Sequence, residues 1–331
     1  MKEISMDFFR DEVRNGFFIP TAVKQAWAAQ LQVLDVIETI CRKHDITYFA
    51  DWGTILGTVR HGGYVPWDDD MDICMKREDY TRFKEAAKTE LPKDFRIHDY
   101  EHQEDHWLFL SRVANSVHIN FEPEHMKQFH NFPYIAGIDI FVLDYLYKDE
   151  QQEKQRCEEV KHIIAVADSI IAGEIAQPVK EANLIQLEEK YHKTFNRKLD
   201  NRHIGIELYR LAEEQMARVP KEESDRMAQI FPWGLLGNRG QDREYYEKFV
   251  RLPFENTTMP VPADYHRILS GKYHDYFKIH KVWSGHDYPY FEGQRKNLQA
   301  VADFKLPEFT FDKAMLRQNA GKRDNQDTMQ N

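Results

Sequence analysis

The sequence predicts an α/β (α+β) fold in which strands alternate with helices. A long segment near the N-terminus has apolar residues at helical spacing, whereas residues 134–147 are dense in β-branched and aromatic side chains. The composition then shifts to Glu, Lys, Gln, Ala and Leu over residues 148–219, which favours helices. Because hydrophobic residues make up 42% and aromatic residues 13% of the chain, a disordered protein is excluded.

The N-terminal segment alternates between the two kinds of element. Residues 21–44 are predicted to form an amphipathic helix. The β-favouring residues 46–49 predict a short strand that runs into a helix starting at Gly53 to Gly57. The turn signal Gly62-Gly63, followed by Pro66, ends that helix. The apolar stripe of the first helix is spaced by three and four residues and consists of Trp27, Leu31, Leu34, Ile37 and Cys41.

The central segment is predicted to supply further strands. Residues 68–75 have an extended pattern, and residues 77–89 return to a helix. Several strand-like stretches follow between residues 95 and 121. Residues 134–147 are the strongest strand candidate in the chain, with carboxylates placed inside the apolar run.

The C-terminal half is predicted to be more varied. Residues 148–219 indicate two or three surface helices, interrupted near Gly173 and Pro178. Residues 231–240 read as a loop, and Pro260-Val261-Pro262 is predicted to open a helix. From about Gln318 the chain is polar enough to be disordered.

Composition excludes several classes of protein. The 331 residues carry a net charge of −10 and no sustained basic stripe, which makes nucleic acid a poor candidate partner. The longest apolar runs fall short of the roughly 20 residues needed to cross a bilayer, and no secretory signal is visible, so we expect a soluble cytoplasmic protein. The three cysteines, Cys41, Cys74 and Cys157, are scattered, which argues against a disulfide framework and a zinc site.

Four of the five residues from Asp68 to Asp72 are acidic. Side chains two apart on a strand share a face, so Asp70 and Asp72 are expected to point together. Two carboxylates about 4–5 Å apart repel by several kcal/mol at an effective dielectric near 20, and a divalent cation such as Mg²⁺ or Mn²⁺ offsets this repulsion. A solvated acidic turn is the alternative. A calcium loop is rejected, because it needs Gly where Ile73 stands and Glu where Asp79 stands.

Residues 48–80, YFADWGTILGTVRHGGYVPWDDDMDICMKREDY, closely resemble the signature of the LicD family, which also includes the fukutin-type transferases. The match extends to GIDIFVLD (residues 137–144) and to VPADYHRILSGKYHDYF (residues 261–277). A lone Asp-x-Asp would be weak, but the Gly-Thr block followed by Arg-His-Gly and Pro-Trp-Asp-Asp-Asp is specific. The chain departs from the family pattern at Val142, where Pro is usual, and at His274, where Gly is usual.

The resemblance implies a polymerase-β-type nucleotidyltransferase core with a small mixed sheet and added helices. It implies a core at residues 1–147, a helical insertion at 148–230, the C-terminal part of the LicD domain at 231–317 and a disordered tail at 318–331. The implied reaction transfers phosphocholine from CDP-choline to a hydroxyl of a teichoic acid, capsule or lipopolysaccharide precursor and releases CMP. It would take place in the cytoplasm or at the inner face of the membrane, with peripheral membrane association left open.

The same resemblance assigns roles to residues, with Mg²⁺ or Mn²⁺ as the implied cofactor. Asp70 and Asp72 are the paired metal ligands. Asp139 completes the metal site or accepts the proton of the acceptor hydroxyl, the alternative being a carboxylate that caps a neighbouring loop. The residues expected to bind the diphosphate are Gly53, Thr54 and Gly57, which bring backbone N–H groups close, and Arg60 and His61, which supply positive charge.

Aromatic residues beside these motifs are candidates for binding a quaternary ammonium group. They are Trp52, Tyr64 and Trp67, for each of which core packing is the alternative, and with weaker reason Trp233, Trp283 and residues 288–291. Three rival functions remain open at this point. They are transfer of glycerol-, ribitol- or ethanolamine-phosphate from a CDP donor, a metal-dependent glycosyltransferase that uses a UDP-sugar, and an inactive scaffold that binds a glycan or partner.

Overall fold

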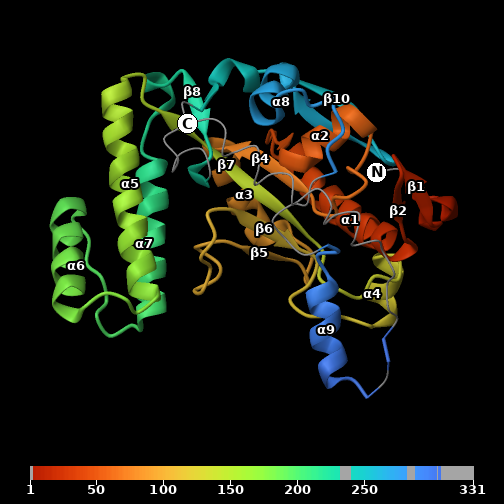
Figure 1. The fold of residues 1–331 in the computed structure, drawn as a ribbon, viewed down its shortest axis with the longest axis horizontal. Coiled ribbons are helices and arrows are strands. Elements are labelled where there is room, and N and C mark those ends of the chain that lie inside the picture. The colour runs from red at the N-terminus through yellow and green to blue at the C-terminus, as the bar shows by residue number, and fades with distance from the viewer. Residues whose placement is uncertain (1–2, 232–239, 282–287, 304, 307–331) are drawn as a thin grey trace.

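The computed structural model describes residues 3–231, 240–281, 288–303 and 305–306 (Figure 1). The predicted loop at 231–240 and the predicted tail from 318 therefore lie outside the described residues, apart from residues 231 and 240, and so do Trp233 and Trp283. The α/β fold class is confirmed, because helices surround a curled sheet of mixed strand direction. None of the described helices combines the length and the apolar character needed to span a membrane.

Within the described part of the chain, the central sheet has seven strands, and the longest of them, β7 (Gly137–Leu146), lies at its centre. One edge of β7 pairs in parallel with β4, whereas its other edge pairs antiparallel with β6 in the first half and with β8 in the second half. The remaining strands extend this arrangement outward. They are β3 (Phe49–Ala50), β4 (Asp72–Lys76), β5 (Arg96–His98), β6 (Ser111–Ala114), β8 (Arg226–Ala228) and β9 (Gln241–Asp242).

The helix α1 (Thr21–Lys43) confirms the predicted amphipathic helix, and every residue of its predicted stripe is buried. This burial places α1 in the main apolar core, against the sheet. Two two-stranded sheets lie outside the central one: β1 (Glu12–Arg14) with β2 (Phe17–Ile19), and β10 (Phe249–Phe254) with β11 (Thr257–Pro262). The other helices here are α2 (Trp52–His61), α3 (Arg77–Glu90), α4 (Pro123–Gln128), α8 (Tyr265–Tyr273) and α9 (Glu292–Val301).

Residues 148–219 form three helices, which confirms the prediction of two or three. These are α5 (Glu150–Ile171), α6 (Gln177–Tyr191) and α7 (Asn201–Met216). The helices α5 and α7 run side by side, and α6 lies on their outer side (Figure 1). These helices share a buried apolar cluster separate from the main core. We call them the helical unit.

Two predicted segments differ in part from the structure. Between residues 95 and 121 only β5 and β6 are strands, and the residues between them form a loop, because its polar sequence HDYEHQEDH lacks the alternation a strand needs. The helix predicted after Pro260-Val261-Pro262 is confirmed as α8, which begins at Tyr265, whereas these three residues themselves end β11. Prolines are tolerated there because β11 is paired on one side within a two-stranded sheet.

Candidate active site

Three charged side chains lie in one row across adjacent strands of the sheet. In the parallel pair of β4 and β7, Asp72 is directly opposite Asp139. In the antiparallel pair of β6 and β7, Arg112 is directly opposite the same Asp139. We call Asp72, Asp139 and Arg112 the charged row. Strand pairing thus brings Asp139 beside Asp72, as the sequence-based hypothesis requires, and adds an arginine that the hypothesis did not include.

Asp72 is buried at the start of β4 among other carboxylates. Burial disfavours its ionised form, and nearby negative charge disfavours it further, so the pKa of Asp72 is raised well above its ordinary value. An added cation would counter both effects. The acidic groups that act on Asp72 are, in decreasing order, Asp70, Asp139, Asp68 and Asp51.

The start of helix α2 holds this acidic group in place. Asp51 is the N-cap residue and accepts a hydrogen bond from the N–H of Trp52. The hydroxyl oxygen of Thr54 accepts a hydrogen bond from the backbone N–H of Asp72 at 2.8 Å, which ties α2 to β4. A Cβ on Gly53 would overlap the carboxylate of Asp68, so the glycine permits this carboxylate to approach the first turn. The positive end of the α2 dipole therefore faces the acidic cluster.

A cavity of about 750 Å³ opens beside the charged row. Asp70, Asp139 and Arg112 line it, together with Tyr290 and Trp107. Cavities of roughly 300–1,000 Å³ bind small molecules and cofactors. The described part of the chain therefore presents two of the three predicted metal-binding carboxylates to a space large enough for a nucleotide-linked substrate.

Asp139 is held by Arg112 in a two-point ion pair. The Nε of Arg112 donates to Oδ1 of Asp139, and its Nη2 donates to Oδ2 at 2.8 Å. Burial opposes the charge on Arg112, but the hydrogen bonds and charge of Asp139, followed by the charges of Asp72 and Asp70, outweigh it and raise the pKa of Arg112. The arginine is thus the cation that partly balances this acidic site.

The donor set fits a divalent cation in its chemistry. Carboxylate oxygens are the ligands that Mg²⁺ and Mn²⁺ prefer, and the raised pKa of Asp72 marks an excess of negative charge. The spacing is less complete. The carboxylate oxygens of Asp70, Asp72 and Asp139 do not all lie within 4.8 Å of one another. Among the described residues, that close spacing is found for Asp99, Glu101 and His102. Asp139 is turned to Arg112 instead.

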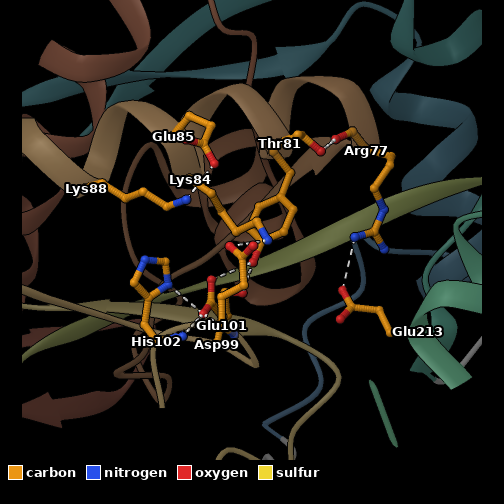
Figure 2. Close-up of polar contacts among 11 residues, drawn as sticks. Arg77, Thr81, Lys84, Glu85, Lys88, Asp99, Glu101, His102 and Glu213 are labelled. Carbon is orange, nitrogen blue, oxygen red and sulfur yellow. Dashed lines mark hydrogen bonds and ion pairs between the residues drawn. The ribbon is translucent and has the colours of Figure 1, made fainter. Parts of the chain in front are cut away.

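The cluster of Asp99, Glu101 and His102 is already satisfied by protein groups (Figure 2). His102 Nδ1 lies 2.7 Å from Oδ1 of Asp99, and Lys84 donates to Oε2 of Glu101 at 2.9 Å. Burial alone would raise the pKa of Asp99, but the hydrogen bonds and charge of His102 outweigh it and lower the pKa. We therefore assign no metal to this cluster.

Arg60 and His61, predicted to bind the diphosphate, contact each other and the backbone. The Nε of Arg60 donates to Nε2 of His61 at 2.9 Å, and its Nη1 donates to the carbonyl oxygen of Tyr276 at 2.9 Å. Burial and the charges of Arg60 and Arg14 lower the pKa of His61 to about 4. His61 is therefore neutral at pH 7, and neither residue lines the cavity of the described structure.

Gly57 and Trp67 have packing roles. A Cβ on Gly57 would overlap the carbonyl oxygen of Gly63, so the glycine allows the turn after α2 to pack closely. Trp67 is only 5% exposed and packs edge-on against Phe17. Tyr64 is also buried and stacks on Trp27. These positions match the core-packing alternative given for the aromatic candidates.

Trp52 contacts a buried lysine. The ammonium of Lys272 lies 4.0 Å from the centre of the Trp52 ring and forms an ion pair with Asp51. The amide of Gln229 also donates to Asp51. Lys272 thus connects α8 to the start of α2.

Sequence reasoning missed three residues of the cavity or left them with weak support. Arg112 lies in an ordinary alternating strand, and no sequence signal tells which strand faces it. Trp107 is 57% exposed in the loop after β5, and a large aromatic residue in a polar loop is a signal that could have singled it out. Tyr290 belongs to the weakly supported run 288–291, and its N–H donates to the carboxylate of Asp69.

Comparisons with known proteins point to one family. Residues 45–164 match the family model described as "LicD/FKTN/FKRP, nucleotidyltransferase domain", which covers the charged row. The lipopolysaccharide cholinephosphotransferase LicD of Haemophilus influenzae is 25% identical over 264 residues, which span 75% of this chain and 89% of that protein. Uncharacterised proteins of Rickettsia typhi and Rickettsia prowazekii are 39% and 42% identical over 54 and 48 residues, each 18% of the relative's length. Over residues 45–164, which hold the charged row, the chain is therefore similar to LicD-family proteins.

Proposed function

We propose that this protein is a metal-dependent transferase that moves phosphocholine from CDP-choline to a hydroxyl of a cell-surface glycan precursor and releases CMP. The observation that carries the proposal is the charged row beside the 750 Å³ cavity, in which Asp70 and Asp139 are exposed to the same space. The H. influenzae relative is named as a cholinephosphotransferase that acts on lipopolysaccharide, which supports the choline donor and a glycan acceptor. We propose that the reaction takes place in the cytoplasm.

The proposed Mg²⁺ or Mn²⁺ ligands are Asp70 and Asp72, with Asp139 as the third. When bound, the cation would neutralise charge on the diphosphate oxygens of the donor. Asp72 would be fixed in position by the hydrogen bond from its N–H to Thr54, and by burial that excludes water from its side. Such rigid placement of charged groups accounts for most of the acceleration in phosphoryl transfer.

In the proposed reaction the acceptor hydroxyl attacks the phosphorus that bears the choline. A bond forms from the acceptor oxygen to phosphorus, and the bond from phosphorus to the bridging oxygen breaks, so that CMP leaves with the bonding electrons. The hydroxyl proton passes to a carboxylate of the site that is not bound to the metal. The product is a phosphodiester.

Trp107 supports a cationic cargo. Its large exposed ring lines the same cavity as Asp70 and Asp139, and a quaternary ammonium binds an aromatic face with roughly 0.5–2 kcal/mol. We expect Trp107→Ala to weaken CDP-choline binding about threefold to thirtyfold, while binding of CDP-glycerol, which carries no cation, stays the same. Phe249→Ala, at a residue 49% exposed on β10, is the matched control.

Thermal-shift measurements test the proposal with CDP-choline, CDP-ribitol, CDP-glycerol, CDP-ethanolamine and a UDP-sugar, each with and without Mg²⁺. A ligand that binds only the folded state raises stability by mass action, so we expect the largest shift with CDP-choline and Mg²⁺. CMP release from CDP-choline, absent with EDTA, is the second readout. A larger shift with another CDP-alcohol would change the cargo. Release of UDP from a UDP-sugar, without CMP release, would replace the proposal with a glycosyltransferase.

A further inference from the structure

Arg112 lies where a resident side chain and an incoming cation would compete for the same carboxylate. It is opposite Asp139, which is in turn opposite Asp72, and its Nη2 donates to Oδ2 of Asp139 at 2.8 Å. Both oxygens of Asp139 accept hydrogen bonds from this guanidinium. As long as they do, Asp139 has fewer lone pairs to offer to a metal ion.

The Arg112 side of the ion pair is open to solvent. The Arg112 side chain is 50% exposed and lines the cavity with Asp70 and Asp139. Water therefore reaches the arginine half of the pair, where it screens the interaction and can take the place of the carboxylate. The stem of Arg112 passes over Gly137, where an added Cβ would lie 2.9 Å from its Cδ. The missing side chain at this position makes room for the arginine stem, which occupies that space.

The guanidinium also has a second use within reach. It presents a planar set of N–H donors to a cavity in which the proposed donor's diphosphate would lie, and this fork matches phosphate oxygens in two-point geometry. The charges of Asp72 and Asp70, besides that of Asp139, act on Arg112. A divalent cation bound by these carboxylates would repel Arg112 and leave its donors available.

We propose that Arg112 is an exchangeable counter-ion: it neutralises Asp139 while the site holds no metal, and it turns to the phosphate groups of the donor when Asp139 becomes a metal ligand. This inference rests on the proposed function, since it assumes that Asp139 takes part in binding a divalent cation. Arg112 is then a substrate-positioning residue. While it is paired with Asp139, its donors are not available to an anion in the metal-free site.

Binding of Mn²⁺ alone, followed by electron paramagnetic resonance of the free ion, tests whether Arg112 competes with the metal ion for Asp139. We expect Arg112→Gln to bind Mn²⁺ at least threefold more tightly than the wild type, because Asp139 has lost its competitor. Removing any positive charge nearby strengthens cation binding somewhat, so the decisive comparison is made with Asp139→Asn. If Arg112 acts through Asp139, Arg112→Gln has little further effect in the Asp139→Asn background. An equal effect in both backgrounds, or unchanged affinity in Arg112→Gln, overturns the exchange.

Binding of CMP at saturating Mn²⁺ tests whether Arg112 turns to the phosphate of the nucleotide. We expect Arg112→Gln to weaken CMP binding at least fivefold and Arg112→Lys to weaken it less, because lysine keeps the charge but not the fork. Unchanged CMP affinity would show that Arg112 does not reach the phosphate. The control is Arg251→Gln. Arg251 lies on β10, and this change removes the ion-pair partner of Glu38.

The two proposals fail in different ways. If the wild type binds Mn²⁺ and CMP while Arg112→Gln leaves both affinities unchanged, the inference is wrong and the proposed function stands. If neither the wild type nor Arg112→Gln binds Mn²⁺ at a site sensitive to Asp70→Asn, the proposed metal site is wrong and the inference falls with it.

Discussion

Strand β7 carries two arginine–aspartate pairs of the same two-point geometry in very different surroundings. Near its start, Asp139 pairs with Arg112, and the two side chains are 15% and 50% exposed. Near its end, Asp144 pairs with Arg77 through bonds of 2.7 Å, and the two side chains are 1% and 20% exposed. Arg77 also donates to Glu213 of α7 at 3.0 Å (Figure 2).

The difference lies in what each pair connects. Arg77 joins α3, β7 and the helical unit, and every charge in this group has a protein partner. The charges of Asp144 and Glu213 overcome the cost of burial and raise the pKa of Arg77. Arg112 and Asp139 instead face a cavity and share a site with further carboxylates. The same chemical pair is therefore structural where it is enclosed and available for function where it is open.

The largest effect is expected on turnover when the aspartates of the open site are changed. Asp70→Asn and Asp72→Asn should each reduce turnover at least a thousandfold, equivalent to about 4 kcal/mol of barrier, because the metal loses a charged ligand. Stability in metal-free buffer should be unchanged or slightly higher, since like-charge repulsion is relieved. CMP release and chemical unfolding measure the two quantities. Retained turnover in both variants would remove the catalytic role of these aspartates.

The enclosed pair is broken by Arg77→Gln. Removing one partner leaves Asp144 charged and buried, so the free energy of unfolding should fall by about 3 kcal/mol. Urea unfolding followed by circular dichroism measures it. Binding of CDP-choline at temperatures where the variant is folded should be preserved. A loss below about 1 kcal/mol would contradict the distinction drawn between the two pairs.

The pH dependence of stability tests the charge excess at the open site. Because the folded-state pKa of Asp72 lies above the ordinary value near 4, the folded protein holds a proton that the unfolded chain has released. Stability from this group is therefore full below about pH 4 and is lost as pH rises through the raised pKa. Between pH 5 and 8 the free energy of unfolding of the wild type should therefore fall more than that of Asp72→Asn. Saturating Mg²⁺ should shrink this difference, and identical pH profiles would contradict the prediction.

The smallest effect is expected for Arg112→Gln on folding. An exposed ion pair contributes up to about 1 kcal/mol, so the free energy of unfolding should change by less than that. Comparison with Arg77→Gln under the same denaturant conditions makes the contrast direct. If Arg112→Gln destabilised the protein as much as Arg77→Gln, the charged row would be a structural element rather than an open one.

Local sequence patterns predicted much of the fold and part of the site. The periodicity of residues 21–44 predicted α1, and the apolar run at 134–147 predicted β7. Family resemblance predicted that Asp139 belongs with Asp70 and Asp72, and the register of β4 with β7 brings Asp72 and Asp139 together. The burial of Trp67 and the ion pair of Lys272 with Asp51 could not be read from the sequence, because they depend on neighbours distant in sequence, such as Phe17 and Asp51.

By itself the sequence determined the resemblance to the LicD family, the alternation of helix and strand, and the acidic cluster from Asp68 to Asp72. These features depend on local periodicity and on residue identity, which are read directly along the chain. Only the tertiary structure decided that Arg112 faces Asp139 and that Trp107 reaches the same cavity. The reason is that strand order and register follow from burying one shared core, so the neighbours of a strand are chosen by packing across the whole domain.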